Sequence, residues 1–502
     1  MSKSKPKTAP PPPANAIPEG AAAEHAISWA IAFSVLVVLV VLLLWAPLAR
    51  IPRRFDINYN EGWNSYIQQT VVNGGRIYGN PPVLTYTNYP PFSFHVVGLL
   101  GKLTGNVTIT ARCLSALSLF LIALFIGLTV RCITGARRYG AYAGLAFLVF
   151  LGIVKPDRIG MNDPQLFGMA IGAFAFYAFV RHPNSTLWLR ISGAAFAVSV
   201  FTKQSLVAFP LAVAIHLFLK DRTRFLGWFV AAAGTSVALI GAIFAFDGPH
   251  FLDHMAFPRT YSGMLLMSNI GWYLLYLQFA LFGALLWSLT KHDDDRLRLL
   301  AWAFWLANLI GFFFSGGAGG DENHVFDGIV AVSMIAGVCV PYALWFSEKT
   351  RRASAVFALA LVLPFFGVLV PLLSFHLPRL FVMEELYAQR ERDFAEAANF
   401  VKSQPGPALC ESLLVCYAAG KAEEYDAYEV AELIRTGKIP EAAVARLFDE
   451  RRFKVIQVDV DANQPLEASS HGRFTDGVFA RLLANYRQVA RTTNTIILVP
   501  RS

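Results

Sequence analysis

Hydrophobic residues along this chain gather in long blocks that are separated by short polar stretches. A bilayer core about 30 Å thick requires roughly 20 apolar residues for each helix that crosses it, and such blocks recur as far as residue 375. The pattern predicts a polytopic α-helical membrane protein with about eleven spans, which together form a transmembrane domain over residues 27–375. The predicted spans are residues 27–49, 108–132, 139–154, 163–180, 188–202, 204–219, 225–246, 269–290, 297–314, 324–346 and 354–375.

The two ends of the chain differ in character from these blocks. Residues 1–26 are rich in Lys and Pro, which predicts a short disordered tail on the cytoplasmic side. The first span lacks a small-residue cleavage site and is too long for a signal peptide, so we expect it to stay as an anchor. Residues 376–502 carry more charge and predict a small extracytoplasmic α/β domain. Its predicted helices are 391–403, 428–436, 440–451 and 474–486, and its predicted strands are 453–461 and 494–500.

The charges between the spans predict how the protein is oriented. If the N-terminal tail lies in the cytoplasm, every inner loop is basic, which is the positive-inside pattern of a cytoplasmic (inner) membrane protein. One group disagrees, because Arg50, Arg53 and Arg54 follow the first span on the outer side. A long translocated loop tolerates such charge, and a basic cluster outside can also meet anionic lipid. The inner basic residues are Arg131, Arg137, Arg138, Arg181, Arg190, Lys220, Arg222, Arg224, Lys291, Arg296, Arg298, Lys349, Arg351 and Arg352.

Composition agrees with this picture. Only 15% of the residues are charged, where a soluble protein has about 25%. The net charge of +9 falls between the apolar blocks, where membrane topology explains it, so we do not expect nucleic acid as a partner. The five cysteines show no metal-ligand spacing. Cys410 and Cys416 are the one close pair, and a disulfide between them requires that their domain lie outside the cytoplasm.

Unusual polar residues collect on the outer side of the predicted spans. Charged groups at membrane depth are costly and are often functional, although solvated loop ends are the alternative for any single residue. The gathering of such residues in several loops on one side favours a functional site there. The outer segments are a long loop at 50–107 and shorter ones at 155–163, 201–205, 247–260 and 315–324.

Carboxylates and cations in these segments suit transfer from a lipid-linked phosphate, which presents its charge at the membrane boundary. Arg and Lys side chains hold a phosphate and stabilise it as a leaving group. A carboxylate that accepts the proton of an incoming hydroxyl typically contributes ~10²–10⁴ in rate. The candidate catalytic acids are Glu61, Asp56 and Asp163. The candidate donor and phosphate ligands are Arg112, Arg158, Lys203, Gln204 and His324.

Several of these residues also have a purely structural interpretation. Asp163 before Pro164 has the composition of a helix N-cap. Lys203 can extend to the membrane interface, and His324 can be a hydrogen-bonded histidine at a helix end. The spacing of His250, Asp253 and His254 permits a metal site on a helix, but no further ligand lies nearby in the sequence, so we expect none. No cofactor is expected with certainty, and a divalent cation near Glu61 and Asp163 stays open.

Four short motifs resemble the GT-C glycosyltransferases, in particular the protein O-mannosyltransferase and aminoarabinose transferase branch. Asn60-Glu61-Gly62-Trp63, followed by the turn at 74–78 and by Asn88-Tyr89-Pro90-Pro91, is similar to the first outer loop of that family, which would place Asn60, Asn88 and Tyr89 in the substrate loop. Asn162-Asp163-Pro164 resembles the family's second acidic motif. The segments 201–204 and 319–337 resemble the part near the lipid phosphate and a late span. The likeness covers residues 27–375 in layout.

The resemblance implies an inverting transferase that takes a sugar from a polyprenyl-phosphate donor in the membrane. The acceptor would be a hydroxyl of a protein, a lipid headgroup or a glycan. Where the family has Asp-Glu, this chain has Asn60-Glu61, and an amide cannot accept the proton. We therefore expect Glu61 to be the base, with Asp56 as the second choice and loss of catalysis as a third possibility.

Two other classes of function compete with a transferase. Transporters and flippases have polar residues in the middle of their spans, whereas here the spans are nearly free of charge and the polar groups lie at one face. The other class is a catalytically inactive scaffold in which the C-terminal domain carries the function. Asn60 is the reason to consider it, because an amide stands there in place of the family's acid.

Overall fold

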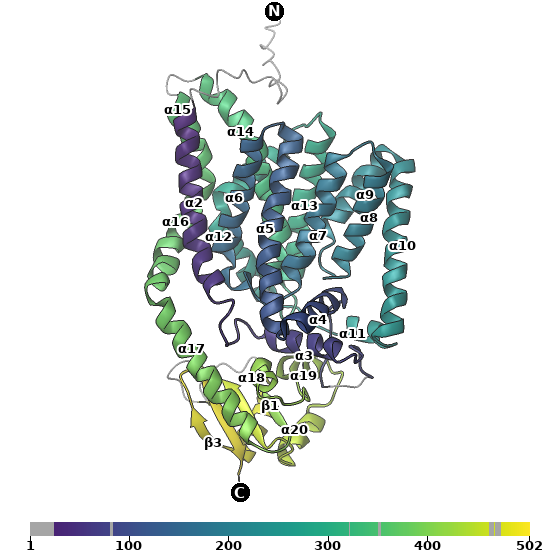
Figure 1. Ribbon diagram of the computed structural model, residues 1–502, viewed down its shortest axis with the longest axis vertical. Coiled ribbons are helices and arrows are strands. Elements are labelled where there is room, and N and C mark those ends of the chain that lie inside the picture. Colours follow the sequence, from purple (N-terminus) through teal and green to yellow (C-terminus); the bar gives the residue numbers. More distant parts are fainter. Residues whose placement is uncertain are drawn as a thin grey trace, which may run out of the picture.

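The computed structural model describes residues 25–80, 84–320, 322–349, 353–460, 466 and 473–501. A bundle of long helices occupies one end of the molecule, and a small domain with a β-sheet occupies the other (Figure 1). The predicted tail at 1–26 lies almost wholly outside the described residues. A polytopic helical membrane protein with a small C-terminal α/β domain is therefore confirmed.

The bundle helices follow the predicted blocks closely. Among the described residues, eight helices are long and apolar enough to cross a membrane, and the shorter apolar helices α7, α8 and α9 lie beside them in the bundle. The count of about eleven spans stays a prediction. The bounds are α2 Ala26–Ala49, α5 Val107–Thr134, α6 Arg137–Val154, α7 Gln165–Arg181, α8 Thr186–Val200, α9 Ala208–Lys220, α10 Arg222–Phe246, α12 Gly263–Ser288, α13 Asp295–Ser315 and α14 Phe326–Glu348.

The last span is broken and continues into the C-terminal domain. Helix α15, Ala353–Val362, is followed by a 3₁₀ turn, by α16, Phe366–Pro371, and by a π-helical turn over Leu372–His376. Pro364 and Pro371 account for the breaks, because proline removes a backbone donor and its ring clashes with the preceding turn. Helix α17, Leu377–Ser403, then runs from the bundle to the sheet (Figure 1).

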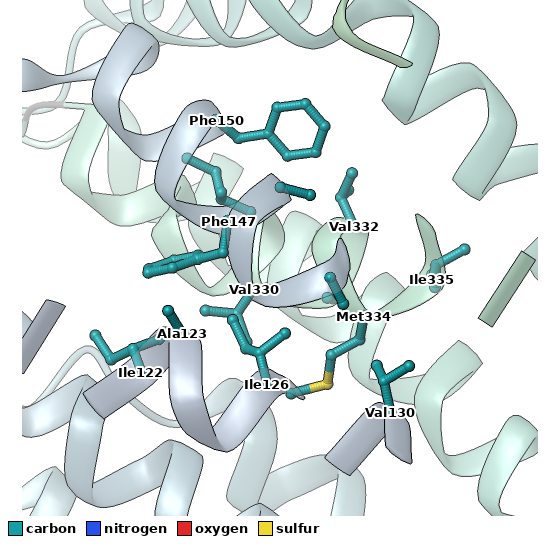
Figure 2. Packing of buried hydrophobic residues seen from close by; sticks show 14 of the residues in the cluster. Ile122, Ala123, Ile126, Val130, Phe147, Phe150, Val330, Val332, Met334 and Ile335 are labelled. Carbon is teal, nitrogen blue, oxygen red and sulfur yellow. The ribbon is translucent and has the colours of Figure 1, made fainter. Parts of the chain in front are cut away.

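The centre of the bundle is packed by α5, α6 and α14. Ile126 of α5, Phe147 and Phe150 of α6 and Met334 of α14 are fully buried and in one cluster (Figure 2). Helices α5 and α6 approach closely at a pair of glycines, since a Cβ on Gly140 would lie 2.2 Å from the carbonyl oxygen of Gly127. Small residues at such a crossing allow the van der Waals contact that holds helices together in lipid.

The segment predicted as one long loop, 50–107, contains two helices. Helix α3, Asn60–Val72, and helix α4, Phe92–Thr104, lie between the bundle and the C-terminal domain (Figure 1). Helix α3 was missed because its buried face is polar and includes Asn64, Ser65 and Gln68. Helix α4 follows the Pro90-Pro91 pair and is too short to cross a bilayer on its own.

The C-terminal domain is a four-stranded sheet with strand order β1-β2-β4-β3. Strands β1 and β2 are parallel and the other pairs antiparallel, with Ile456 opposite Leu498. The predicted helices and the strands at 453–461 and 494–500 are confirmed, whereas β1, β3 and α18 were missed because β1 and α18 are very short and β3 is mostly polar. Cys410 and Cys416 form a disulfide. The bounds are β1 Ala408–Cys410, α18 Leu413–Ala418, α19 Ala427–Arg435, α20 Glu441–Asp449, β2 Val455–Asp459, α21 Asp476–Asn485, β3 Tyr486–Arg491 and β4 Thr495–Pro500.

Candidate functional site

The loops predicted to share one face of the membrane do meet at one end of the bundle, next to the C-terminal domain (Figure 1). The Tyr78 N–H donates to the Asp247 carbonyl oxygen at 3.1 Å, and the Gln204 Nε2 donates to the Asn88 carbonyl oxygen at 2.6 Å. Tyr261 forms an isolated antiparallel bridge with Gly317. The structure therefore brings residues from widely separated loops together.

Glu61 lies at the start of α3 and is completely buried in an ion pair with Arg112 of α5. The Arg112 Nε donates to Glu61 Oε1 at 2.8 Å, and its Nη2 donates to Oε2 at 2.5 Å. The backbone N–H groups of Ile57 and Asn162 donate to the same two oxygens at 2.7 and 2.8 Å. Each oxygen of Glu61 thus accepts two hydrogen bonds, and a paired, buried carboxylate of this kind holds neighbouring segments in place.

Arg112 uses its remaining donors on the chain that leads from the first span to α3. Its Nη1 donates to the Arg53 carbonyl oxygen at 2.7 Å, and its Nη2 donates to the Phe55 carbonyl oxygen at 2.6 Å. Both functions predicted for the pair, catalysis for Glu61 and phosphate binding for Arg112, would require these contacts to open.

A network of buried amides continues from Glu61 along α3. Gln68 and Asn162 exchange two hydrogen bonds between their side chains, at 2.7 and 2.9 Å. Asn64 Nδ2 donates to the Asn162 carbonyl oxygen at 2.8 Å, and Asn162 Nδ2 donates to Ser65 Oγ at 3.2 Å. Ser65 and Gln68 were not predicted from the sequence to belong to the site. Their only signal was the polar face of α3 at helical spacing.

Asp163 follows this network and lies between two cations. Its Oδ1 accepts from Lys203 Nζ at 3.0 Å, and its Oδ2 accepts from Arg158 Nη1 at 3.2 Å. Burial alone would raise the pKa of Asp163, but Lys203 and Arg158 hold it below its ordinary value, so the carboxylate is ionised at neutral pH. Lys203 also lies 4.6 Å from the centre of the Tyr89 ring, which is close enough for a cation–π contact. Asp163 is in addition a helix-end acceptor for the Gln165 N–H at 2.8 Å.

Asp56 belongs to a different environment, between the membrane domain and the C-terminal domain. Its Oδ2 accepts from Ser412 Oγ at 3.1 Å, and its carbonyl oxygen accepts from Arg390 Nη2 at 2.7 Å. Burial and the nearby charge of Asp459 raise the pKa of Asp56. Arg158 and Lys203 pair with Asp163 and not with Asp56, so these two predicted acids lie in separate groups.

The remaining predicted residues lie around these groups. Asn60 is the first residue of α3, and its backbone N–H donates a hydrogen bond to Asn58 Oδ1 at 3.2 Å. His324 lies in a 3₁₀ turn with its ring 5.7 Å from that of Phe314. His254 accepts from the Thr87 N–H and contacts the Gly79 carbonyl oxygen, both at 3.0 Å, which is a structural role. Within the described residues, no group of three or more His, Cys, Asp or Glu side chains is placed to hold a metal ion.

An apolar cavity of about 560 Å³ adjoins the Lys203 loop and was not anticipated. It is lined by residues of α4, of the end of α10 and of the loop at 201, and its lining includes the exposed side chains of Leu99 and Phe246. His95 Nε2 in its wall lies 2.9 Å from both carboxylate oxygens of Asp247. Exposed apolar residues thus form part of the lining of this cavity.

Comparisons with known proteins agree with this architecture. Residues 88–245 match the family model described as dolichyl-phosphate-mannose-protein mannosyltransferase. The structure of ArnT from Cupriavidus metallidurans bound to undecaprenyl phosphate matches 93% of this chain and 97% of its own, with a TM-score of 0.56 and 12% identity. The apo structure of the same protein matches 93% of this chain and 98% of its own, with a TM-score of 0.58 and 14% identity. No curated protein sequence matches the chain.

Another solved structure has a similar fold. The oligosaccharyltransferase of Archaeoglobus fulgidus, tethered with an acceptor peptide, matches 94% of this chain and 74% of its own, with a TM-score of 0.54 and 11% identity. ArnT and this enzyme are both GT-C glycosyltransferases, so the GT-C resemblance is confirmed at the level of the fold. At such low identity the likeness establishes the fold and not the substrate.

Proposed function

We propose that this chain, which has the GT-C fold over nearly its whole length, is an inverting glycosyltransferase that uses a polyprenyl-phosphate sugar. The observation that carries the proposal is the buried group of Asp163, Arg158 and Lys203 at the end of the bundle where the loops meet. It combines an ionised carboxylate with two cations, which are the groups that transfer from a lipid-linked phosphate needs. The ArnT structure bound to undecaprenyl phosphate supports a donor of this class.

The donor phosphate would be held by Lys203 and Arg158. Its isoprenoid chain would enter the apolar cavity, because Phe201 lines that cavity and lies two residues before Lys203. Pro91 and Phe92 also line the cavity and follow Tyr89, whose ring covers the Lys203 ammonium. The cavity and the cations are thus connected through two short pieces of chain.

We assign the base to Asp163 among the three candidate acids. Glu61 has all four of its hydrogen bonds made within the protein, and Asp56 points toward the C-terminal domain. In the free protein the two cations make Asp163 a weak base. A phosphate that draws Lys203 and Arg158 to itself would raise the pKa of Asp163 toward its ordinary value and so couple proton acceptance to donor binding.

In the reaction, the acceptor oxygen forms a bond to the anomeric carbon from the face opposite the phosphate. The bond between that carbon and the phosphate oxygen breaks, and polyprenyl phosphate leaves with the bonding electrons. The hydroxyl proton passes to Asp163. Lys203 and Arg158 stabilise the leaving phosphate, and the Glu61–Arg112 pair fixes the chain on which Asn162 and Asp163 are carried.

We place this chemistry on the outer face of the cytoplasmic membrane, with the C-terminal domain outside. The basic inner loops support this orientation. The Cys410–Cys416 disulfide also supports it, since disulfides persist in oxidising compartments.

The test is transfer of radiolabelled sugar from a panel of polyprenyl-phosphate sugars by the purified full-length protein. We expect one donor to be consumed, with Asp163→Asn lowering the rate by about 10²–10⁴. Lys203→Met should raise the KM for the donor, and Asp56→Asn should leave donor binding unchanged. Each variant is compared at equal folded concentration, judged by thermal unfolding. If the intact protein consumes no donor with any acceptor, the proposal fails and a transporter or an inactive scaffold becomes the better interpretation.

A further inference from the structure

A second cavity, of about 260 Å³, lies where the membrane domain meets the C-terminal domain. It is separate from the apolar cavity and shares no lining residue with it. Three parts of the chain that are far apart in sequence build it: the start of the first loop, helix α17, and the sheet domain through Ser412, Asp459 and Thr495. Because both domains contribute, the site exists only while they are docked.

The lining offers more hydrogen-bond acceptors than the protein itself satisfies. Ser412 is the one donor to the Asp56 carboxylate within the described part of the chain, and it reaches only Oδ2. Asp393 Oδ1 accepts from Gln389 at 2.7 Å, while its Oδ2 is buried and has no partner among the described residues. Asp459 is satisfied by Gln457 and Arg473. Asp56 Oδ1 therefore has no donor within the described part of the chain, and a ligand that brings donors would complete this wall.

Donor groups and aromatic rings share the same wall. Arg390 lies 4.5 Å from the centre of the Phe55 ring, and Asn494 has an exposed side chain beside Thr495. Phe394 adds a second ring. Carboxylates, an amide, hydroxyls and aromatic rings in one small cavity suit a molecule with many hydroxyl groups and apolar ring faces.

The size and the charge of the cavity limit which ligands it can bind. The cavity lies below the range of about 300–1,000 Å³ that drug-sized ligands occupy, so it takes a single ring and not an extended peptide. The acids Asp56, Asp393 and Asp459 outnumber the two cations beside them, Arg390 and the Arg473 that pairs with Asp459, and like charges repel an anionic ligand.

We propose that this interdomain cavity binds one neutral sugar ring, and that the acceptor of the transferase is therefore a glycan anchored there. The assignment of this sugar to the acceptor rests on the proposed function. Binding of the sugar itself does not.

The experiment measures binding of methyl glycosides of neutral hexoses and pentoses to the purified full chain, without donor, by saturation-transfer NMR and equilibrium titration. Methyl glucoside and methyl glucuronide form a matched pair that differs only in the carboxylate. We expect at least one neutral glycoside to bind, and the glucuronide to bind at least ten-fold more weakly than the glucoside. Thr495→Trp, which fills the cavity, and Asp393→Asn should each weaken binding at least ten-fold. Glu396→Gln, an exposed acid on the same helix, should change it less than two-fold.

Absence of binding by every neutral glycoside, or equal binding by Thr495→Trp, would overturn the inference. Equal binding of the glucuronide would show that the lining does not select by charge and would also overturn it. The two proposals fail separately. If a glycoside binds but no donor is consumed, the sugar site is supported and the transferase proposal is overturned. Donor consumption with a peptide or lipid acceptor whose KM is unmoved by Thr495→Trp supports the transferase and overturns the assignment of the cavity to the acceptor.

Discussion

Glu61 and Arg112 carry charges that this fold buries completely. Removing one partner of such a pair leaves the other charge without compensation, which typically costs 3–5 kcal/mol. The two residues are far apart in the chain and are joined only when α3 docks against α5. Their pairing is thus a property of the assembled loops and not of either loop alone.

Arg112→Met should therefore lower the free energy of unfolding by about 3–5 kcal/mol, because Glu61 is left buried and unpaired. Thermal unfolding in detergent measures this. Glu61→Gln should also lower the stability of the protein. The folded fraction of this variant should nevertheless keep a large part of its transfer activity per molecule. A Glu61→Gln protein of unchanged stability that has lost more than 100-fold in rate would instead identify Glu61 as the base.

The sequence allowed the important residue types and their common side of the membrane to be predicted, but not their partners. Glu61, Asp163 and Lys203 stand out because charge is rare beside apolar blocks. That Glu61 would meet Arg112, or Asp163 would meet Lys203, depends on tertiary packing of loops with no periodic signal. Asp56 was grouped with Glu61 because they are neighbours in sequence, yet the chain turns between them and their carboxylates face different partners.

At the scale of elements, α19 binds the C-terminal domain to the loops through one acidic face. Asp426, Glu429 and Glu432 are three residues apart and so share a side of the helix. Asp426 accepts from the Tyr59 hydroxyl, and Glu429 accepts from the Tyr86 N–H. Glu432 Oε2 accepts from the Thr260 N–H at 2.9 Å and its hydroxyl at 2.8 Å. Burial raises the pKa of Asp426 and of Glu429.

The segment at 421–423, where the Lys421 carbonyl oxygen accepts from the Tyr66 hydroxyl of α3 at 2.8 Å, should loosen as the pH rises. Burial and the nearby Asp426 raise the pKa of Glu423 from 4.5 to about 8. A raised pKa means that the folded state binds the proton more tightly, so this contribution is complete below pH 4.5 and is lost as the pH rises to about 8. Hydrogen exchange over α19, corrected for the chemical exchange rate at each pH, should accelerate between these pH values. Glu423→Gln should make this corrected rate depend less on pH. An unchanged pH dependence in the variant would contradict the assignment.

Helix α3 meets α18 so closely that a glycine is required at the contact. A Cβ on Gly62 would lie 2.4 Å from the Leu414 backbone nitrogen and 2.7 Å from the Leu413 carbonyl carbon. Gly62→Ala should force the two helices apart, lower stability by about 1–3 kcal/mol and expose the junction at 404–407 to protease. Gly241→Ala in α10 is the control, because nothing lies within 4 Å of a Cβ there. Equal melting temperatures of the two variants would refute the contact.

Elements with a strong hydrophobic period were predicted well, and elements without one were not. The bundle helices and strands β2 and β4 follow long apolar runs. Helix α3 buries amides, and strand β3 is largely exposed, so neither presents an apolar pattern.

At the scale of the whole molecule, partners can be named for the arginines that disagree with the predicted orientation. Arg50 donates to the Pro156 and Ile159 carbonyl oxygens at 2.7 and 3.1 Å. Arg53 pairs with Glu384 and Glu391 of α17, and the Arg54 N–H also donates to Glu391. The side chains of Arg50 and Arg53 are therefore bound within the protein, and α17 supplies both acidic partners of Arg53.

A chain that ends at residue 375 should insert its first span less uniformly, because Glu384 and Glu391 are missing. A reporter at the N-terminus that is fluorescent only in the cytoplasm measures the misoriented fraction. Arg53→Ala in the truncated chain should lower that fraction. An equal fraction in the full-length and truncated chains would show that the first span is oriented without α17.

The order of synthesis gives these contacts a further meaning. A ribosome makes the three outer arginines more than three hundred residues before Glu384 and Glu391. During that interval the insertion machinery holds a first span whose flanking charges favour retention on the wrong side. The acidic side chains of α17 can pair with Arg53 only after that late helix has been made. In the predicted orientation, a helix that is made late would thus hold the first helix in place.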